Sequence, residues 1–265
     1  MRERPDRGGI RFAVFDFDGT ISLIREGWQQ IMIPMMVETL VSLRTGETEE
    51  ALRTAVTDFV DRLTGQQTIY QMIQLAEEVR KRGGTPLAPL AYKRIYHDCL
   101  LARIADRLKG LKGGTIPPAD LVVTGSFDLL ENLRNRGVTL FLASGTDEAY
   151  VKDEAGALGV SKYFNGGIYG ALDQHEKFSK RMLIADLFRR HGLRGHEMAV
   201  FGDGYVEIEN AREADGLAVG VASDEARRCG VDAWKRGRLI QAGADLIVPD
   251  HREQGPVVAY LFGET

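Results

Sequence analysis

The stretch "AVFDFDGT" (residues 13–20) decides the fold of this chain. It ends the apolar run "IRFAVFDFD" (10–18) with two carboxylates, Asp16 and Asp18, followed by Gly19, which permits a sharp turn. A nearly continuous run of Val, Ile, Phe and Ala is typical of a strand buried on both faces, as in a parallel sheet. We therefore expect a central first strand whose carboxyl end carries two acids.

Four further apolar runs end in Asp, Ser or Gly: "VTLFLASG" (138–145), "EMAVFGDG" (197–204), "GLAVGVAS" (216–223) and "ADLIVPD" (244–250). Segments with helical spacing lie between them. They include "SFDLLENLRNRG" (126–137), and a segment from 179 to 192 that opens with Ser179 as a possible N-cap and closes at Gly192. This alternation predicts an α/β fold, a doubly wound parallel sheet.

Residues 22–116 break the alternation, because they contain helical patterns separated by Gly-containing loops and no convincing strand. We expect a helical cap domain at 22–116, inserted between the first strand and the rest of the sheet. Residues 1–21 and 117–265 would then form the α/β core.

Composition narrows the function classes. The chain has 265 residues, 44% hydrophobic and 27% charged, with a net charge of −4, which argues against nucleic-acid binding by phosphate neutralisation. Its two cysteines, Cys99 and Cys229, form no C-x-x-C pair, so neither a disulfide framework nor a zinc site is expected. Neither a signal-peptide pattern nor an apolar run long enough to span a bilayer occurs, so we expect a soluble, cytoplasmic protein without a membrane partner.

Reactive side chains gather at the predicted strand ends and helix starts. Carboxylates at Asp16, Asp18 and Asp203 would form an oxygen-rich site for a hard cation such as Mg²⁺, because parallel strands present their carboxyl ends at one edge. Ser144 offers a hydroxyl and Lys180 a cation, and both can hold phosphoryl oxygens. Without a metal and the lysine, the acids would repel one another.

Four motifs in this order resemble those of the haloacid dehalogenase superfamily. "DFDGT" (16–20) is similar to its first motif, "LASGT" (142–146) to its second, "SKRMLIADLF" (179–188) to its third and "FGDGYVEIE" (201–209) to its fourth. The resemblance covers roughly 10–21 and 117–250, and the helical insertion resembles the family's α-helical cap.

The resemblance implies roles for the first two acids. Asp16 would be the nucleophile that forms an aspartyl-phosphate. Asp18 would protonate the leaving oxygen and then activate water, and its backbone carbonyl would reach the metal.

The resemblance also implies the metal and phosphate ligands. Asp16, Asp18 and Asp203 would hold Mg²⁺, with Glu207 bound through a water; Glu207 could instead be a solvated acid at a helix start. The implied phosphate-binding residues are Thr20, Ser144, Gly145 and Lys180. Lys177 competes with Lys180, which is favoured because side chains in a first helical turn lean toward the helix N-terminus.

Substrate contacts in the cap are harder to read. The loop "TGQQTIYQM" (64–72) could place Gln66, Gln67 and Thr68 against substrate hydroxyls, or it could be only a helix cap and turn. Arg25 follows the first motif and could meet a second anionic group, but the pattern favours a solvated arginine.

These observations indicate a Mg²⁺-dependent phosphatase, a phosphoric monoester hydrolase that acts on a small phosphorylated metabolite. A sugar or polyol phosphate fits the polar loop, and a phosphoglycolate-type acid is the alternative. A phosphomutase with the same four motifs is the nearest alternative function. A second alternative is a non-catalytic protein that uses the fold only for binding. The sequence leaves the oligomeric state open.

Overall fold

The structure is a computed structural model that describes residues 8–264. The chain divides into two compact units, one formed by Met1–Glu26 with Leu108–Thr265 and the other by Gly27–Arg107. We refer to them as the α/β unit and the helical unit. The helical unit is thus shorter at both ends than the segment 22–116, and Arg25 falls in the α/β unit.

The α/β unit is built on a six-stranded sheet in the order β3-β2-β1-β4-β5-β6, in which every neighbouring pair is parallel. The strands are β1 Phe12–Phe15, β2 Thr139–Asp147, β3 Gly167–Ala171, β4 Met198–Gly202, β5 Leu217–Val221 and β6 Leu246–Val248. β1 lies between β2 and β4, with Phe12 paired to Thr139 on one side and to Met198 on the other. This topology confirms the predicted doubly wound parallel fold.

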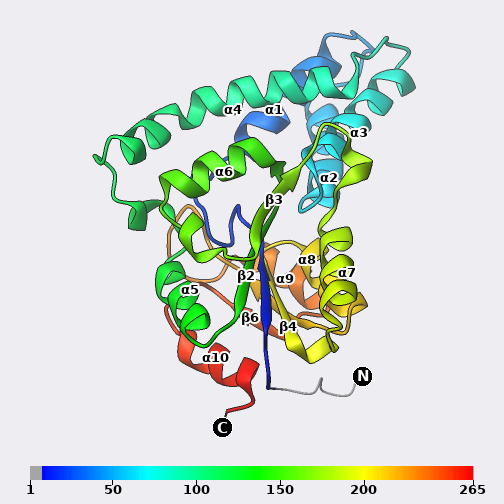
Figure 1. Cartoon of the computed structure of the whole chain (residues 1–265). Coiled ribbons are helices and arrows are strands. Elements are labelled where there is room, and N and C mark those ends of the chain that lie inside the picture. The colour runs from blue at the N-terminus through cyan, green and yellow to red at the C-terminus, as the bar shows by residue number, and fades with distance from the viewer. Residues whose placement is uncertain (1–7, 265) are drawn as a thin grey trace. The chain divides into compact units, whose positions relative to one another are not determined.

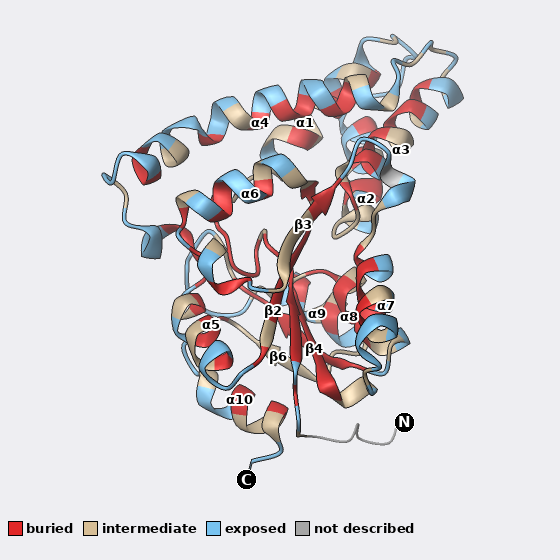
Figure 2. Cartoon of the chain, viewed as in Figure 1, coloured by how far each residue is buried: buried red, intermediate tan, exposed pale blue. Residues whose placement is uncertain are grey.

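Helices cover both faces of this sheet (Figure 1). They are α5 Ser126–Asn135, α6 Glu148–Ala157, α7 Lys180–His191, α8 Tyr205–Glu213, α9 Ala233–Ala242 and α10 Gln254–Phe262. On one face, Val14 of β1 and Val200 of β4 pack with Leu187 of α7, Ile208 of α8 and Leu239 of α9 in one apolar cluster. α5 and α10 lie on the opposite face (Figure 1). The central strands β1, β4 and β5 are therefore buried along their length, whereas the edge strand β6 is half-buried and the helices have one exposed side (Figure 2).

Local signals set the ends of α7. The Ser179 hydroxyl accepts a hydrogen bond from the backbone N–H of Met182 at 3.1 Å, which satisfies one of the free donors of the first turn. Gly192 ends the helix in the left-handed conformation, with φ 58°. These are the two caps that the sequence predicts, and they fix Lys180 as the first residue of α7.

The edge strand β3 does not appear among the sequence predictions. Its segment, "GIYGA", is short and contains two glycines, which lower strand propensity. The packing explains Gly170, because a Cβ there would overlap the backbone of Glu148 at the start of α6. β3 forms because its neighbour β2 supplies the pairing from Phe141↔Gly167 onward.

The helical unit contains α1 Gln29–Val41, α2 Glu49–Leu63, α3 Thr68–Lys81 and most of α4, Pro89–Lys112, with no strand among the described residues. The side chain of Thr48 caps α2 by accepting from the N–H of Ala51 at 3.2 Å. Each of the first three helices has buried apolar residues on one side, for example Met36 in α1, Val56 in α2 and Leu75 in α3. Together they form the interior of this unit. Within residues 8–264, no helix combines the length and the hydropathy needed to cross a membrane.

Candidate active site

The order of the strands marks one edge of the sheet as a binding site. The chain forms β1, β2 and β3 outward in one direction and then returns to place β4 on the other side of β1. Such a reversal leaves a crevice at the carboxyl ends of the central strands. Asp16 follows β1 directly, and its N–H donates to the carbonyl of Phe201 in β4 at 2.8 Å. The carboxylate of Asp16 is therefore held at this edge, and the residue is only 6% exposed.

Lys180 binds two of the site's carboxylates. Its Nζ donates to Oδ1 of Asp16 at 2.5 Å and also to Oε1 of Glu207, which lies in the first turn of α8. All three side chains are buried. Lys177 is exposed, so the structure places Lys180 rather than Lys177 against the first motif.

The electrostatics of this trio follow from burial. Burial raises the pKa of Asp16 well above its ordinary value, although the charge of Lys180 opposes the rise and that of Glu207 adds to it. Burial also disfavours the charged form of Lys180, but the two carboxylates outweigh it and raise the pKa of the lysine. The ammonium of Lys180 therefore stays charged, and its charge favours the ionised form of Asp16 against the rise that burial causes.

Asp18 is held by the second motif. The hydroxyl of Thr146 donates to its Oδ2 at 3.0 Å, and the N–H of Thr146 donates to the hydroxyl of Ser144 at 3.0 Å. β2 extends through both residues to Asp147, with an irregular register between Ala143 and Asp147. Ser144 therefore lies inside the strand rather than at its end, and Thr146 is the residue of this motif that contacts Asp18.

The surroundings of Asp18 suit a proton donor. Burial raises its pKa to about 6, and the guanidinium of Arg25, with Nε 4.0 Å from Oδ1, limits the rise. Its Oδ2 accepts from Thr146, whereas Oδ1 is buried without a hydrogen-bond partner among the described residues.

The guanidinium of Arg25 binds a carboxylate of the protein, that of Glu154, and not the anionic substrate group that the sequence suggested. Its Nη2 lies 2.7 Å from Oε1 of Glu154, and its Nε lies 3.0 Å from Oε2, so α6 binds it in bidentate fashion. Both residues are buried, with Arg25 5% exposed and Glu154 1%. This pair ties the segment after the first motif to the helix after the second. Because Glu154 already engages its guanidinium, we do not propose Arg25 as a substrate-binding residue.

A second buried lysine binds the fourth motif. Nζ of Lys235, in the first turn of α9, lies 2.8 Å from Oδ2 of Asp203 and 2.6 Å from Oε1 of Glu225. Burial disfavours its charge, but Asp203 and Glu225 raise the pKa of the lysine above its ordinary value. Asp203 itself lies against Gly19, whose φ is +76° and where a Cβ would overlap Oδ2. The turn of the first motif thus needs glycine both for its backbone and for this close approach.

The site is suited to a divalent cation by charge and by ligand type. Five carboxylates (Asp16, Asp18, Asp203, Glu207 and Glu225) face two ammonium groups (Lys180 and Lys235), which leaves three negative charges when all are ionised. Hard oxygen ligands of this kind suit Mg²⁺. Buried oxygens of Asp18 and Glu207 also lack hydrogen-bond partners within residues 8–264.

The arrangement of these side chains limits how a metal ion could bind. Among the described residues, no three Asp, Glu, His or Cys side chains are grouped as a metal ion would require. Each lysine instead binds a carboxylate that would be a ligand. A cation entering this site would therefore compete with Lys180 and Lys235 for oxygens.

The remaining predicted residues divide between the two units. Thr20 is fully buried, its Oγ1 has no hydrogen-bond partner in the described part of the chain, and its carbonyl lies 2.9 Å from Nε2 of His251. Gly145 is half-buried in β2. Gln67 and Thr68 belong to the helical unit, where Gln67 is the N-cap of α3 but its side chain makes no capping bond. Gln67 is buried and Thr68 half-buried.

Several polar residues at or near the site have no role among the sequence predictions. In the α/β unit they are Thr146, Glu154, Ser223, Glu225 and Lys235. One signal could have found Lys235: it follows the N-cap Asp232 closely, and a cation in a first helical turn is unfavourable next to the helix dipole unless something offsets it. Lys180 occupies the same kind of position.

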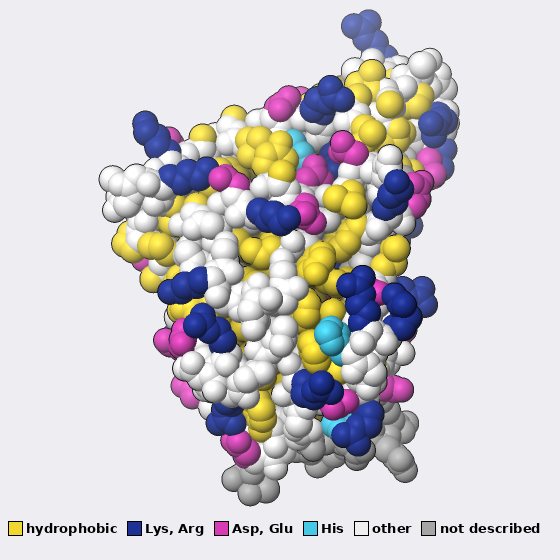
Figure 3. All heavy atoms as spheres, in the orientation of Figure 1, with side chains coloured by type: hydrophobic (Ala, Val, Ile, Leu, Met, Phe, Trp, Pro, Cys, Tyr) yellow, Lys and Arg dark blue, Asp and Glu magenta, His cyan; other side chains and the backbone are white. Residues whose placement is uncertain are grey.

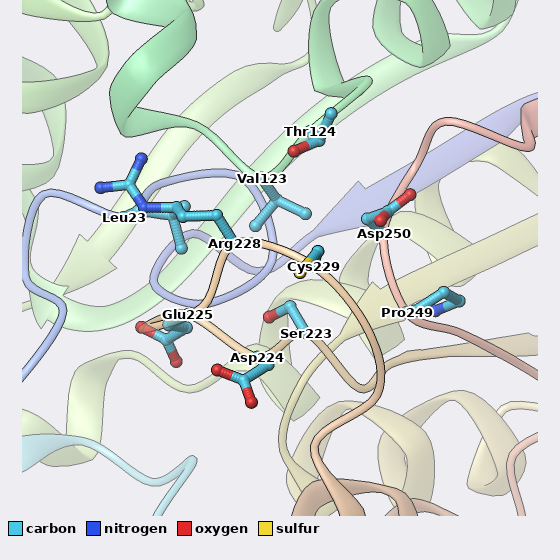
Figure 4. A pocket seen from close by; sticks show the side chains of 10 residues that line it. All are labelled: Leu23, Val123, Thr124, Ser223, Asp224, Glu225, Arg228, Cys229, Pro249 and Asp250. Atoms are coloured by element: carbon cyan, nitrogen blue, oxygen red, sulfur yellow. The ribbon is translucent and has the colours of Figure 1, made fainter.

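A small hollow, open to solvent, lies beside this edge. Figure 4 shows Ser223, Asp224 and Glu225 in succession on the loop after β5, with Asp250 and Pro249 across from them. Elsewhere, on the face shown in Figure 3, Lys and Arg side chains stand among Asp and Glu, and the described residues form no continuous basic surface there. That distribution agrees with the net charge of −4.

The fold and its edge define a class: a doubly wound α/β protein with an acidic, lysine-containing site at the carboxyl ends of its central strands. The sequence model of the haloacid dehalogenase-like hydrolases matches residues 10–215, and the chain belongs to this family. A search of curated proteins gave no match.

Solved structures share the fold at low sequence identity. A predicted phosphatase from Clostridium acetobutylicum is 16% identical, with TM-score 0.62, over 94% of this chain and 98% of the other. A predicted phosphoglycolate phosphatase from Haemophilus somnus is 16% identical, with TM-score 0.59 and the same coverage. A β-phosphoglucomutase from Clostridium difficile is 15% identical, with TM-score 0.64, over 96% of this chain and 98% of the other.

Proposed function

We propose that this hydrolase is a Mg²⁺-dependent phosphatase that cleaves a small phosphorylated metabolite through an aspartyl-phosphate. The observation that carries the proposal is the position of Asp16, which lies at the end of the central strand with Lys180 2.5 Å from its Oδ1. Phosphoryl transfer depends mainly on such positioning and charge stabilisation.

In the first step, a carboxylate oxygen of Asp16 attacks phosphorus and the ester P–O bond breaks. The leaving oxygen takes the proton from the carboxyl group of Asp18, which Thr146 holds through Oδ2. The product is the phosphorylated Asp16, and Lys180 offsets the charge of the transferred group.

In the second step, water attacks phosphorus and gives its proton to the carboxylate of Asp18. The bond between Asp16 and phosphorus breaks, which releases inorganic phosphate and restores both acids. The pKa of about 6 lets Asp18 act in both directions near neutral pH.

Asp16, the backbone of Asp18 and Asp203 would hold Mg²⁺, with Glu207 reaching it through water. When bound, the ion supplies charge neutralisation and polarises the phosphoryl group. Ser144, Gly145 and Thr20 would contribute hydrogen bonds to the phosphoryl oxygens.

For the substrate we propose a sugar or polyol phosphate. The polar loop with Gln66, Gln67 and Thr68 supports this choice, because amide and hydroxyl side chains bind the hydroxyl groups of such molecules. Two of the solved structures with this fold are described as a predicted phosphoglycolate phosphatase and a β-phosphoglucomutase. These two activities are therefore the alternatives for this chain.

The test compares phosphate release by the wild-type protein and Asp16→Asn, with Mg²⁺ and p-nitrophenyl phosphate, followed by a panel of phosphorylated metabolites. We expect release by the wild type and a loss of at least about 10³-fold in the variant. Equal activity in both proteins would contradict the role of Asp16. A mutase would leave the total organic phosphate of its substrate unchanged.

A further inference from the structure

Lys235 is a buried cation that the phosphatase mechanism does not use. It is the third residue of α9, and the carboxylate of Asp232 caps that helix by accepting the N–H of Lys235 at 2.8 Å. The residue is only 9% exposed. A lysine so buried, at the positive end of a helix, needs strong compensation.

The ammonium of Lys235 has three N–H donors and three acceptors. They are Oε1 of Glu225 at 2.6 Å, Oδ2 of Asp203 at 2.8 Å and the hydroxyl of Ser223 at 3.4 Å. The Ser223 hydroxyl in turn donates to the carbonyl of Gly19 at 2.7 Å. Lys235 thereby connects the loops after β1, β4 and β5.

The contact with Asp203 has a direct consequence for metal binding. Asp203 is the proposed metal ligand, and one of its two oxygens is already held by an ammonium. Gly19 lies against the same oxygen. A divalent cation that binds Asp203 must therefore do so beside a fixed positive charge, whose repulsion in a buried site is large.

We propose that Lys235 sets the affinity of the site for its divalent cation, by holding Asp203 and repelling the ion, and that Glu225 moderates this effect by sharing the ammonium. The inference rests on the metal of the proposed function. It assigns a role to Lys235 and Glu225, which lie outside the four motifs that characterise the sequence.

The expected effects have opposite signs. Lys235→Met removes the competing charge and tightens Mg²⁺ binding by about tenfold or more. Glu225→Gln leaves Asp203 as the one carboxylate among the three acceptors of the ammonium and removes a negative charge, so Mg²⁺ binds at least about threefold more weakly. Lys235→Arg keeps the charge and the wild-type affinity within about threefold. A purely structural role predicts instead that both Lys235→Met and Glu225→Gln weaken binding.

The experiment is calorimetric titration of MgCl₂ into the full-length, chelator-treated protein without substrate. Lys112→Met is the matched control, because Lys112 also forms an ion pair, at 2.7 Å to Asp153, but on the surface. It should leave the affinity unchanged. If Lys235→Met is less stable than the wild type without metal, Mg²⁺ should raise its melting temperature more than that of the wild type, because tighter binding to the folded state stabilises it further.

Equal or weaker Mg²⁺ binding by Lys235→Met would overturn the inference, as would equal tightening by Lys112→Met. Binding to neither wild type nor Lys235→Met would also overturn it. The proposed activity is tested separately by phosphate release with Asp16→Asn. A protein that shows the affinity changes but releases no phosphate would refute the phosphatase and leave the role of Lys235 intact.

Discussion

The α/β unit and the helical unit use charged side chains in different ways. At the sheet edge, Lys180 pairs with Asp16 across 164 positions of sequence, and side-chain exposures are 7% and 8%. In the helical unit, Arg53 pairs with Glu49 one turn away, with exposures of 47% and 65%. Buried pairs carry a large desolvation cost, whereas exposed helical pairs contribute little in either direction. In the first of these two pairs the chain bears the cost of buried charge where the motifs converge, and in the second the charges stay in solvent.

The largest effect is expected at Lys180. Lys180→Met leaves the carboxylates of Asp16 and Glu207 buried without their cation, which should cost about 3–5 kcal/mol of stability. Loss of the charge should also lower kcat for phosphate release by at least about 10²-fold. Chemical denaturation and steady-state kinetics measure the two effects. Lys177→Met is the control, and a comparable loss there would break the distinction between the two lysines.

The next effect separates two glycines with the same backbone conformation. Gly19 has φ +76° and lies against Asp203, whereas Gly46 in the helical unit has φ +86°, and a Cβ added there would meet no described atom within 4 Å. Gly46→Ala should cost about 1 kcal/mol, from the left-handed conformation alone. Gly19→Ala should cost about 2 kcal/mol or more, since crowding adds to it. Equal free energies of unfolding would show that the crowding is relieved without cost.

A smaller effect depends on pH. Burial lowers the pKa of His251 below its ordinary 6.5, although the hydrogen bond to Thr20 partly opposes this. The folded state therefore binds the proton less well than the unfolded state, so this residue reduces stability as pH falls below 6.5. Between pH 6.5 and 5.5, the wild type should lose stability, by at most about 1 kcal/mol, relative to His251→Gln, which keeps a donor but does not titrate. Parallel stability curves for the two proteins would contradict this assignment.

The smallest effect is expected at the exposed pair of α2. Arg53→Ala removes the contact with Glu49, at 2.7 Å, and should change the free energy of unfolding by less than about 0.5 kcal/mol. Its phosphate release should equal that of the wild type. A large loss of either property would mean that charged pairs in the helical unit carry more than the comparison allows.

Much of the α/β unit follows from its sequence because the signals are local. The continuous apolar runs predicted five of the six strands, and the caps Ser179 and Gly192 placed the helix that carries Lys180. β3 was missed because its pairing with β2 and the fit of Gly170 against α6 lie outside its own sequence. The roles assigned to the site residues stay predictions until the variants are measured.

The sequence by itself determined the fold class, the family and the identity of the acids at the first and fourth motifs, because strand periodicity and turn chemistry act over a few residues. Only the tertiary structure decided which partners those acids have. Thr146 binds Asp18, Glu154 binds Arg25, and Lys235 binds Asp203. The physical reason is that a buried charge takes its partner from whatever the packed sheet brings within reach, and that neighbourhood is set by strand order rather than by distance along the chain.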